Sequence, residues 1–93
     1  MIGDPDCKTW TMDRQKAAKA NGVEVFSDYY VTAWILGFVT GVNISITKNK
    51  DLLSKIDADT IFLWVDRYCS QNPKKDLADA GGELLLELAK IPN

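Results

Sequence analysis

Residues 29–47 read YYVTAWILGFVTGVNISIT and form the longest stretch of the chain without a charged side chain. That length would suffice to cross a bilayer. Five hydroxyl or amide side chains, however, dilute its hydropathy below what a membrane helix needs. We therefore expect no membrane insertion but a central helix buried on most of its sides, with Ser27 or Asp28 as its N-cap. Gly37 and Gly41, four residues apart, are expected to let another helix pack closely.

Helices are also expected before and after this stretch. Residues 8–20 are rich in Ala, Lys, Arg and Gln, which favour helices, and Asn21-Gly22 is a typical helix stop. A third helix should run from a cap at Asp57 or Asp59 to Gln71, because a proline follows two residues later. Its apolar side chains recur at helical spacing, at Ile61, Trp64, Val65, Tyr68 and Cys69.

The clearest amphipathic pattern lies between Asp76 and Lys90. One face of this fourth helix carries Leu77, Ala80, Gly81, Leu84, Leu85 and Leu88. The polar residues 48–51 should form a loop, and no internal repeat is present. The sequence therefore predicts one all-α domain of four helices over residues 1–93, with residues 1–6 as a flexible N-terminal segment.

The charged residues argue against catalysis and against nucleic-acid binding. The chain of 93 residues has 11 Lys and Arg, 13 Asp and Glu, and no His, so it offers neither a basic stripe nor an imidazole base or metal ligand. Asp57 and Asp59 lack the further oxygen ligands and the glycine of a calcium loop. Asp66-Arg67, Glu83 and Glu87 are expected on solvated helix faces rather than in an acid–base site. We expect no catalytic residue, no metal and no cofactor.

The two cysteines, Cys7 and Cys69, leave two alternatives open. In a reducing compartment they would be two buried thiols, and in an oxidising one a single long-range disulfide, which we favour for so small a domain. A disulfide requires export, yet residues 1–6 show neither a basic start nor an apolar core. Met1 is therefore expected to stand where a signal peptide has been removed.

Aromatic side chains supply the candidates for protein binding. Phe26, Tyr29 and Tyr30 cluster at the start of the central helix and are the first choice for a partner-binding patch. Phe62 is the second choice, because it lies on the opposite side of its helix from Val65. The three Trp, one in each of the first three helices, are expected to supply bulk to the core.

Several motifs occur in an order that resembles a known group of proteins. A Cys with a Trp three residues on (Cys7 to Trp10) precedes the helix WILGFVTGVN, residues 34–43, and the run WVDRYCSQNP, residues 64–73, precedes a leucine-rich helix. From Cys7 to Leu88 the chain resembles the small exported helical proteins grouped around the HdeA-like acid-stress chaperones and the Rap1a/Tai-type immunity proteins of bacteria. The segment between its two cysteines is longer than in HdeA proper.

The resemblance implies a periplasmic or secreted all-α domain with one disulfide, carried here by Cys7 and Cys69, and without catalytic residues. Its partner would be a protein: unfolding clients for the HdeA-like branch, whose dimer loosens in acid, or one toxin for the immunity branch. A homodimer is therefore one expectation. In acid the carboxylates become neutral and the 11 basic groups remain, so the net charge would change from −2 to roughly +11.

Overall fold

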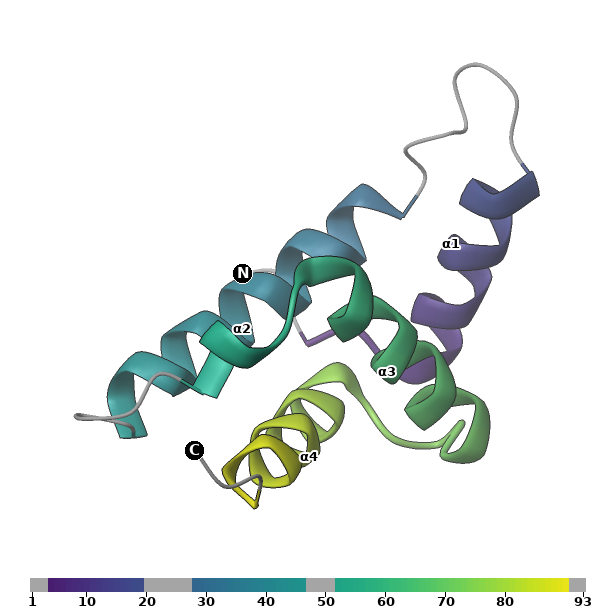
Figure 1. Ribbon diagram of the computed structural model, residues 1–93. Coiled ribbons are helices and arrows are strands. Elements are labelled where there is room, and N and C mark those ends of the chain that lie inside the picture. The colour runs from purple at the N-terminus through teal and green to yellow at the C-terminus, as the bar shows by residue number, and fades with distance from the viewer. Residues whose placement is uncertain (1–3, 20–27, 47–51, 91–93) are drawn as a thin grey trace.

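Helices make up the regular structure of the chain in residues 4–19, 28–46 and 52–90, which are the residues that the computed structural model describes. They are α1 (Cys7–Lys19), α2 (Tyr29–Ile46), the 3₁₀-helix η2 (Leu52–Lys55), α3 (Ala58–Gln71) and α4 (Leu77–Ala89) (Figure 1). Within these residues the only β-pairing is an isolated bridge between Asp6 and Asp76. The predicted all-α class with four α-helices is confirmed. Asn21-Gly22, residues 48–51 and Ser27 lie outside the described residues.

The two C-terminal helices begin at aspartate caps close to the predicted ones. Asp57, not Asp59, caps α3, and its side chain accepts from the Thr60 amide at 2.8 Å. Asp76 caps α4 in the same way and accepts from the Asp79 amide at 2.9 Å. These caps are local, because each acceptor lies three residues before its donor, and they fix where both helices start.

Helix α2 buries one stripe rather than most of its surface. Val31, Ile35 and Val39 are fully buried, and Asn43 is almost so. The opposite side of α2, including Tyr29 and Gly37, is exposed. The expectation of a helix buried on most sides is therefore wrong, because α1, α4 and η2 contact only one face of α2. The four-residue spacing of the stripe is that of a single helix face.

The glycine that permits close packing lies in α4 rather than in α2. A Cβ atom at Gly37 or Gly41 would meet nothing within 4 Å in the part of the chain that the structure describes. At Gly81 it would meet the Phe38 ring at 2.7 Å and Val39 at 3.1 Å. The predicted packing role of Gly37 and Gly41 is thus not seen among the described residues, and Gly81 supplies the close approach of α4 to α2.

A disulfide and a short backbone pairing hold the start of the chain. Cys7 at the beginning of α1 is bonded to Cys69 near the end of α3. Just before it, the Pro5 carbonyl accepts from the Leu77 amide and the Cys7 amide donates to Lys75, both at 2.9 Å. The expected flexibility of residues 1–6 is therefore wrong for residues 4–6, which are bound to the α3–α4 turn. Residues 1–3 lie outside the described part.

The three tryptophans do not contribute equally to the core. Trp10 is fully buried, whereas Trp34 and Trp64 are half-buried and pack against the core from its edge. Trp34 stacks on Phe38 with ring centroids 5.3 Å apart, and Trp64 stacks on Tyr68 at 5.4 Å.

In the described residues no helix combines the length and the apolar character that spanning a bilayer requires.

Candidate functional site

The most connected polar group among the described residues is the guanidinium of Arg14, which joins three helices. Its Nε and one terminal nitrogen donate to the two carboxylate oxygens of Asp66 at 3.0 and 2.9 Å. The other terminal nitrogen donates to Asp28 at 3.0 Å. Arg14 lies on α1, Asp28 directly precedes α2, and Asp66 lies on α3. One side chain therefore ties together helices that are far apart in sequence.

Aromatic rings enclose the same guanidinium. Its central carbon lies 5.6 Å from the ring centroids of both Trp10 and Phe62, within the range of a cation–π interaction. The indole Nε1 of Trp10 donates to Asp66 at 2.8 Å. The hydrogen bonds that Arg14 donates to Asp66 are the chief cause that raises the pKa of Arg14, and the one to Asp28 adds to it. The guanidinium therefore stays charged. Whether α1, α2 and α3 remain joined at this point depends on its carboxylate partners, Asp28 and Asp66.

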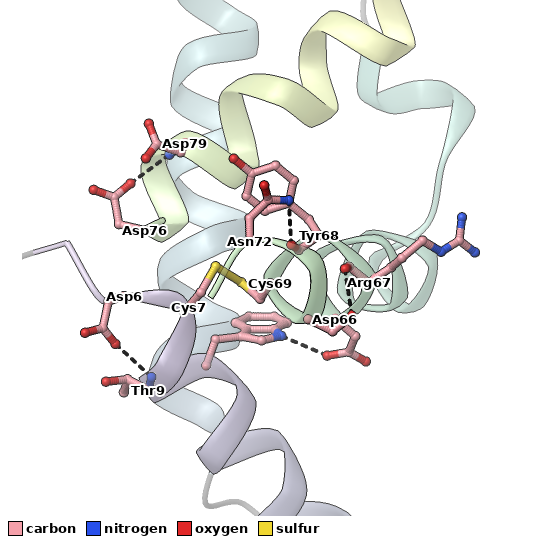
Figure 2. Close-up of a disulfide and its surroundings, with 12 residues drawn as sticks. Asp6, Cys7, Thr9, Asp66, Arg67, Tyr68, Cys69, Asn72, Asp76 and Asp79 are labelled. Atoms are coloured by element: carbon pink, nitrogen blue, oxygen red, sulfur yellow. Dashed lines mark hydrogen bonds between the residues drawn. A yellow bond between two sulfur atoms is a disulfide. The ribbon is translucent and has the colours of Figure 1, made fainter. Parts of the chain in front are cut away.

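Helical spacing explains how the cluster forms. Trp10 and Arg14 are four residues apart on α1, and Phe62 and Asp66 are four apart on α3, so each pair shares one helix face. The disulfide brings the two helices together beside this point (Figure 2). A hollow of about 360 Å³ adjoins the cluster, lined by Thr11, Arg14, Gln15, Ala17, Ala18 and Asp66.

The predicted partner-binding aromatics are placed differently from one another. Tyr29 and Tyr30 are exposed at the start of α2, with 70% and 42% of their surface accessible. Phe26 lies outside the described residues. Phe62 is half-buried and packs against both the Trp10 ring, with centroids 6.1 Å apart, and the guanidinium of Arg14, so it does not form an open patch of its own. Tyr29 follows Asp28 directly, so the exposed tyrosines adjoin the Arg14 cluster.

Aspartates at the helix starts have shifted acidities with clear causes. Hydrogen bonds from the amide of Thr9 lower the pKa of Asp6, and those from Thr60 lower the pKa of Asp57. The Asp79 amide lowers the pKa of Asp76. In each case the charged carboxylate is the better hydrogen-bond acceptor, so these caps are strongest when ionised.

Asp4 behaves in the opposite way. Its side chain accepts from the Ala78 amide at 3.1 Å, beside the Asp76 cap. Burial, followed by a hydrogen bond to Asp76, raises the pKa of Asp4 to about 6. A protonated Asp4 can donate to the ionised Asp76, whereas two ionised carboxylates at this junction repel each other.

Sequence reasoning missed the role of Asp66. It was expected on a solvated face, but it is half-buried and accepts three hydrogen bonds from α1. Arg67, Glu83 and Glu87 are exposed, as expected. Figure 2 shows Asp66 and Tyr68 leaving α3 on different sides. The available signal was the pairing of a buried-face Trp with an Arg four residues on, which calls for a carboxylate partner.

Neither a metal site nor a known relative identifies a function for the described site. The described residues contain no group of three or more His, Cys, Asp or Glu side chains that could hold a metal ion. Comparison of the chain with protein families, with curated proteins and with solved structures found no match. The resemblance to the HdeA-like and Rap1a/Tai-type proteins therefore rests on the sequence motifs alone.

Proposed function

We propose that this protein is a non-enzymatic, exported protein-binding domain that acts as an HdeA-like acid-stress chaperone. Such a chaperone is folded at neutral pH and loosens in acid, where it holds unfolding client proteins. The observation that supports this most is the dependence of the helix joints on ionised carboxylates. Arg14 joins α1, α2 and α3 through Asp28 and Asp66, and aspartate caps start α3 and α4.

Acid acts on these joints in one direction. A carboxylate whose pKa is lowered in the folded state stabilises the fold above its unfolded pKa, and this contribution is lost as the pH falls through the folded value. The caps Asp6, Asp57 and Asp76 belong to this class. Below about pH 4, protonation of aspartate in general also removes the negative partners of a guanidinium. At the same time the excess of positive charge makes the helices repel.

The disulfide limits how far the domain opens. It joins α1 to α3 irrespective of pH, so acid is expected to separate the helices without dispersing the chain. The apolar stripe of α2, formed by Val31, Ile35 and Val39, would then become accessible to clients. A disulfide is also compatible with the oxidising periplasmic or extracellular compartment that this role requires.

The test compares apolar exposure and client protection across pH. The purified full chain should bind a fluorescent apolar dye and suppress aggregation of an acid-labile protein at about pH 3, but not at neutral pH. An Asp66→Asn variant lacks the ionised carboxylate at every pH, so its dye binding should begin at a higher pH than that of the wild type. Flat dye fluorescence and no suppression of aggregation at any pH would contradict the proposal.

A second candidate, a Rap1a/Tai-type immunity protein, is favoured by one observation. Tyr29 and Tyr30 are already exposed in the folded domain, as a preformed binding patch requires. Such a protein would bind one secreted toxin at neutral pH and block its activity. A Tyr29→Ala/Tyr30→Ala variant should then lose both binding and neutralisation. Neutralisation that the double variant retains in full would contradict this candidate.

A further inference from the structure

The surface between α3 and α4 carries a hollow that is separate from the Arg14 cluster. Its volume is about 220 Å³, and it is lined by Trp64, Arg67, Tyr68, Gln71, Glu83 and Glu87. The aromatic residues come from α3 and the glutamates from α4. These two helices pack against each other along this side of the molecule (Figure 1). We refer to these six residues as the α3–α4 groove.

The aromatic side of the groove is flat and fixed. Trp64 and Tyr68 stack with their rings 5.4 Å apart and tilted by 12°. Both side chains are half-buried, so part of their surface faces the groove. Stacked rings that are held in this way present electron-rich faces to a cation or to a planar guanidinium.

The α4 side of the groove is acidic. Glu83 and Glu87 are four residues apart and share one helix face, and Asp76 and Asp79 lie nearer to the start of the same helix. Burial raises the pKa of Tyr68, and the negative charges of Asp79, Glu83 and Asp76 raise it further. The raised pKa of the Tyr68 hydroxyl therefore reflects, in addition to burial, a negative electrostatic potential at the groove.

The basic groups nearby leave Glu83 and Glu87 able to pair with a cation from a partner. Arg67 lines the groove, but among the described residues no ion pair joins it to Glu83 or Glu87. Lys90 pairs with Glu87 at 3.3 Å, with both side chains more than half exposed. An ion pair that is so exposed contributes little and is easily exchanged for another cation.

We propose that the α3–α4 groove binds an arginine- or lysine-rich segment of a partner protein. A basic side chain would stack on Trp64 and Tyr68 and pair with Glu83 and Glu87. The groove is present in the folded domain, so this binding operates at neutral pH and does not require the helices to separate. It therefore goes beyond the acid-stress function and does not depend on it.

The test titrates the full chain into a short dye-labelled peptide of alternating Arg and Gly, at neutral pH and low salt, and follows fluorescence anisotropy. A Glu83→Gln/Glu87→Gln variant should bind about tenfold more weakly. Arg67→Gln should bind about threefold more tightly, because it removes the positive charge that competes for the groove. Both variants change exposed side chains, so far-UV circular dichroism should confirm that their fold is unaltered.

The matched control removes one acidic charge elsewhere on α3. Asp59 is exposed and lies seven residues before Asp66, on the α3 face that meets α1. Asp59→Asn should change the affinity by less than about twofold. Its counterpart in the groove is the single variant Glu83→Gln, which also removes one acidic charge. The proposal is overturned if Asp59→Asn weakens binding as much as Glu83→Gln does, or if a peptide with Glu in place of Arg binds equally well. It is also overturned if the wild type does not bind the basic peptide. Each result leaves the acid-stress proposal standing.

Discussion

Gly81 is the glycine of α4 that packs tightly against α2. A Cβ atom at residue 81 would lie only 2.7 Å from the Phe38 ring, and Phe38 is itself stacked against the Trp34 ring. The next residue, Gly82, has open space at the same position. The two adjacent glycines of one helix therefore differ in what an added methyl group would meet.

Alanine substitutions at the two glycines should change the stability of the fold in opposite directions. Gly81→Ala should destabilise the fold by about 1–3 kcal/mol, because the Phe38 ring must move within a packed site. Gly82→Ala should stabilise it by roughly 0.5–1 kcal/mol, because alanine loses less backbone entropy in a helix. Urea denaturation of both variants measures this. A Gly81→Ala protein as stable as Gly82→Ala would show that Phe38 has room to yield.

Asp4 gives the fold a second pH dependence, opposite in sign to that of the caps. Because the pKa of Asp4 is raised to about 6 in the folded state, its contribution is full below the unfolded value and is lost as the pH rises through about 6. Asp4→Asn keeps an uncharged side chain at every pH. The melting temperature of this variant, relative to the wild type, should therefore rise between about pH 4 and pH 6.

Thermal unfolding followed by circular dichroism at several pH values gives this comparison. Asp59→Asn serves as the control, since it removes an aspartate from the exposed start of α3, away from the Asp4–Asp76 junction. Its melting temperature relative to the wild type should show no such trend. A difference for Asp4→Asn that stays constant across the window would contradict a raised pKa of Asp4 in the folded state.

At the scale of the elements, the Arg14 cluster is the main polar joint between α1 and α3. Asp66→Asn replaces an ionised acceptor of three hydrogen bonds with a neutral one. Hydrogen bonds to charged groups contribute about 1.5–3 kcal/mol when they are partly buried. Because Asp66 is about one third exposed, we expect a loss near the lower end, about 1–2 kcal/mol.

Chemical denaturation in low and high salt tests this joint. Salt screens an ion pair, so the difference between Asp66→Asn and the wild type should shrink as salt is added. Asp59→Asn, on the same helix face but without these partners, should stay close to the wild type. An Asp66→Asn loss no larger than that of Asp59→Asn would mean that α1 is held by the disulfide and by apolar contacts alone.

The elements differ in how far their sequence determines them. The starts of α3 and α4 were predictable because Asp57 and Asp76 act on amides only three residues away. The partner of Arg14 was not, because Asp66 lies 52 residues away and the pairing depends on how two helices cross. The burial of α2 was overestimated, because a high apolar content does not say which of its sides another helix covers.

At the scale of the whole molecule, the disulfide contributes most through the unfolded chain. It closes a loop across 62 positions, and the chain-entropy relation gives about 4 kcal/mol for a loop of that size. A Cys7→Ala/Cys69→Ala variant should lose about this much stability, which is a large share of the total for a small domain. Urea denaturation at neutral pH, with reduced wild type as the comparison, measures the loss. A double variant as stable as the oxidised protein would contradict this entropic contribution.

The all-α class was predictable from local sequence signals, whereas the candidate site depends on how the helices assemble. The class follows from four segments with helical periodicity and local stop signals. The site depends on the assembly: Phe62, expected to form a partner-binding surface, is half-buried because α1 places Trp10 and Arg14 against it. Tyr29 and Tyr30 stay exposed because no described helix covers that end of α2.

The position of the bridge also changes what proteolysis can do to the protein. Cys7 and Cys69 enclose α1, α2, η2 and most of α3 in one covalent ring. A protease that cuts the backbone once anywhere inside this ring linearises it but releases no fragment. The nicked protein would keep its mass, apart from one added water, until a reductant separates it into two pieces. The bridge would thus keep the helices of an opened domain tethered after a first cut.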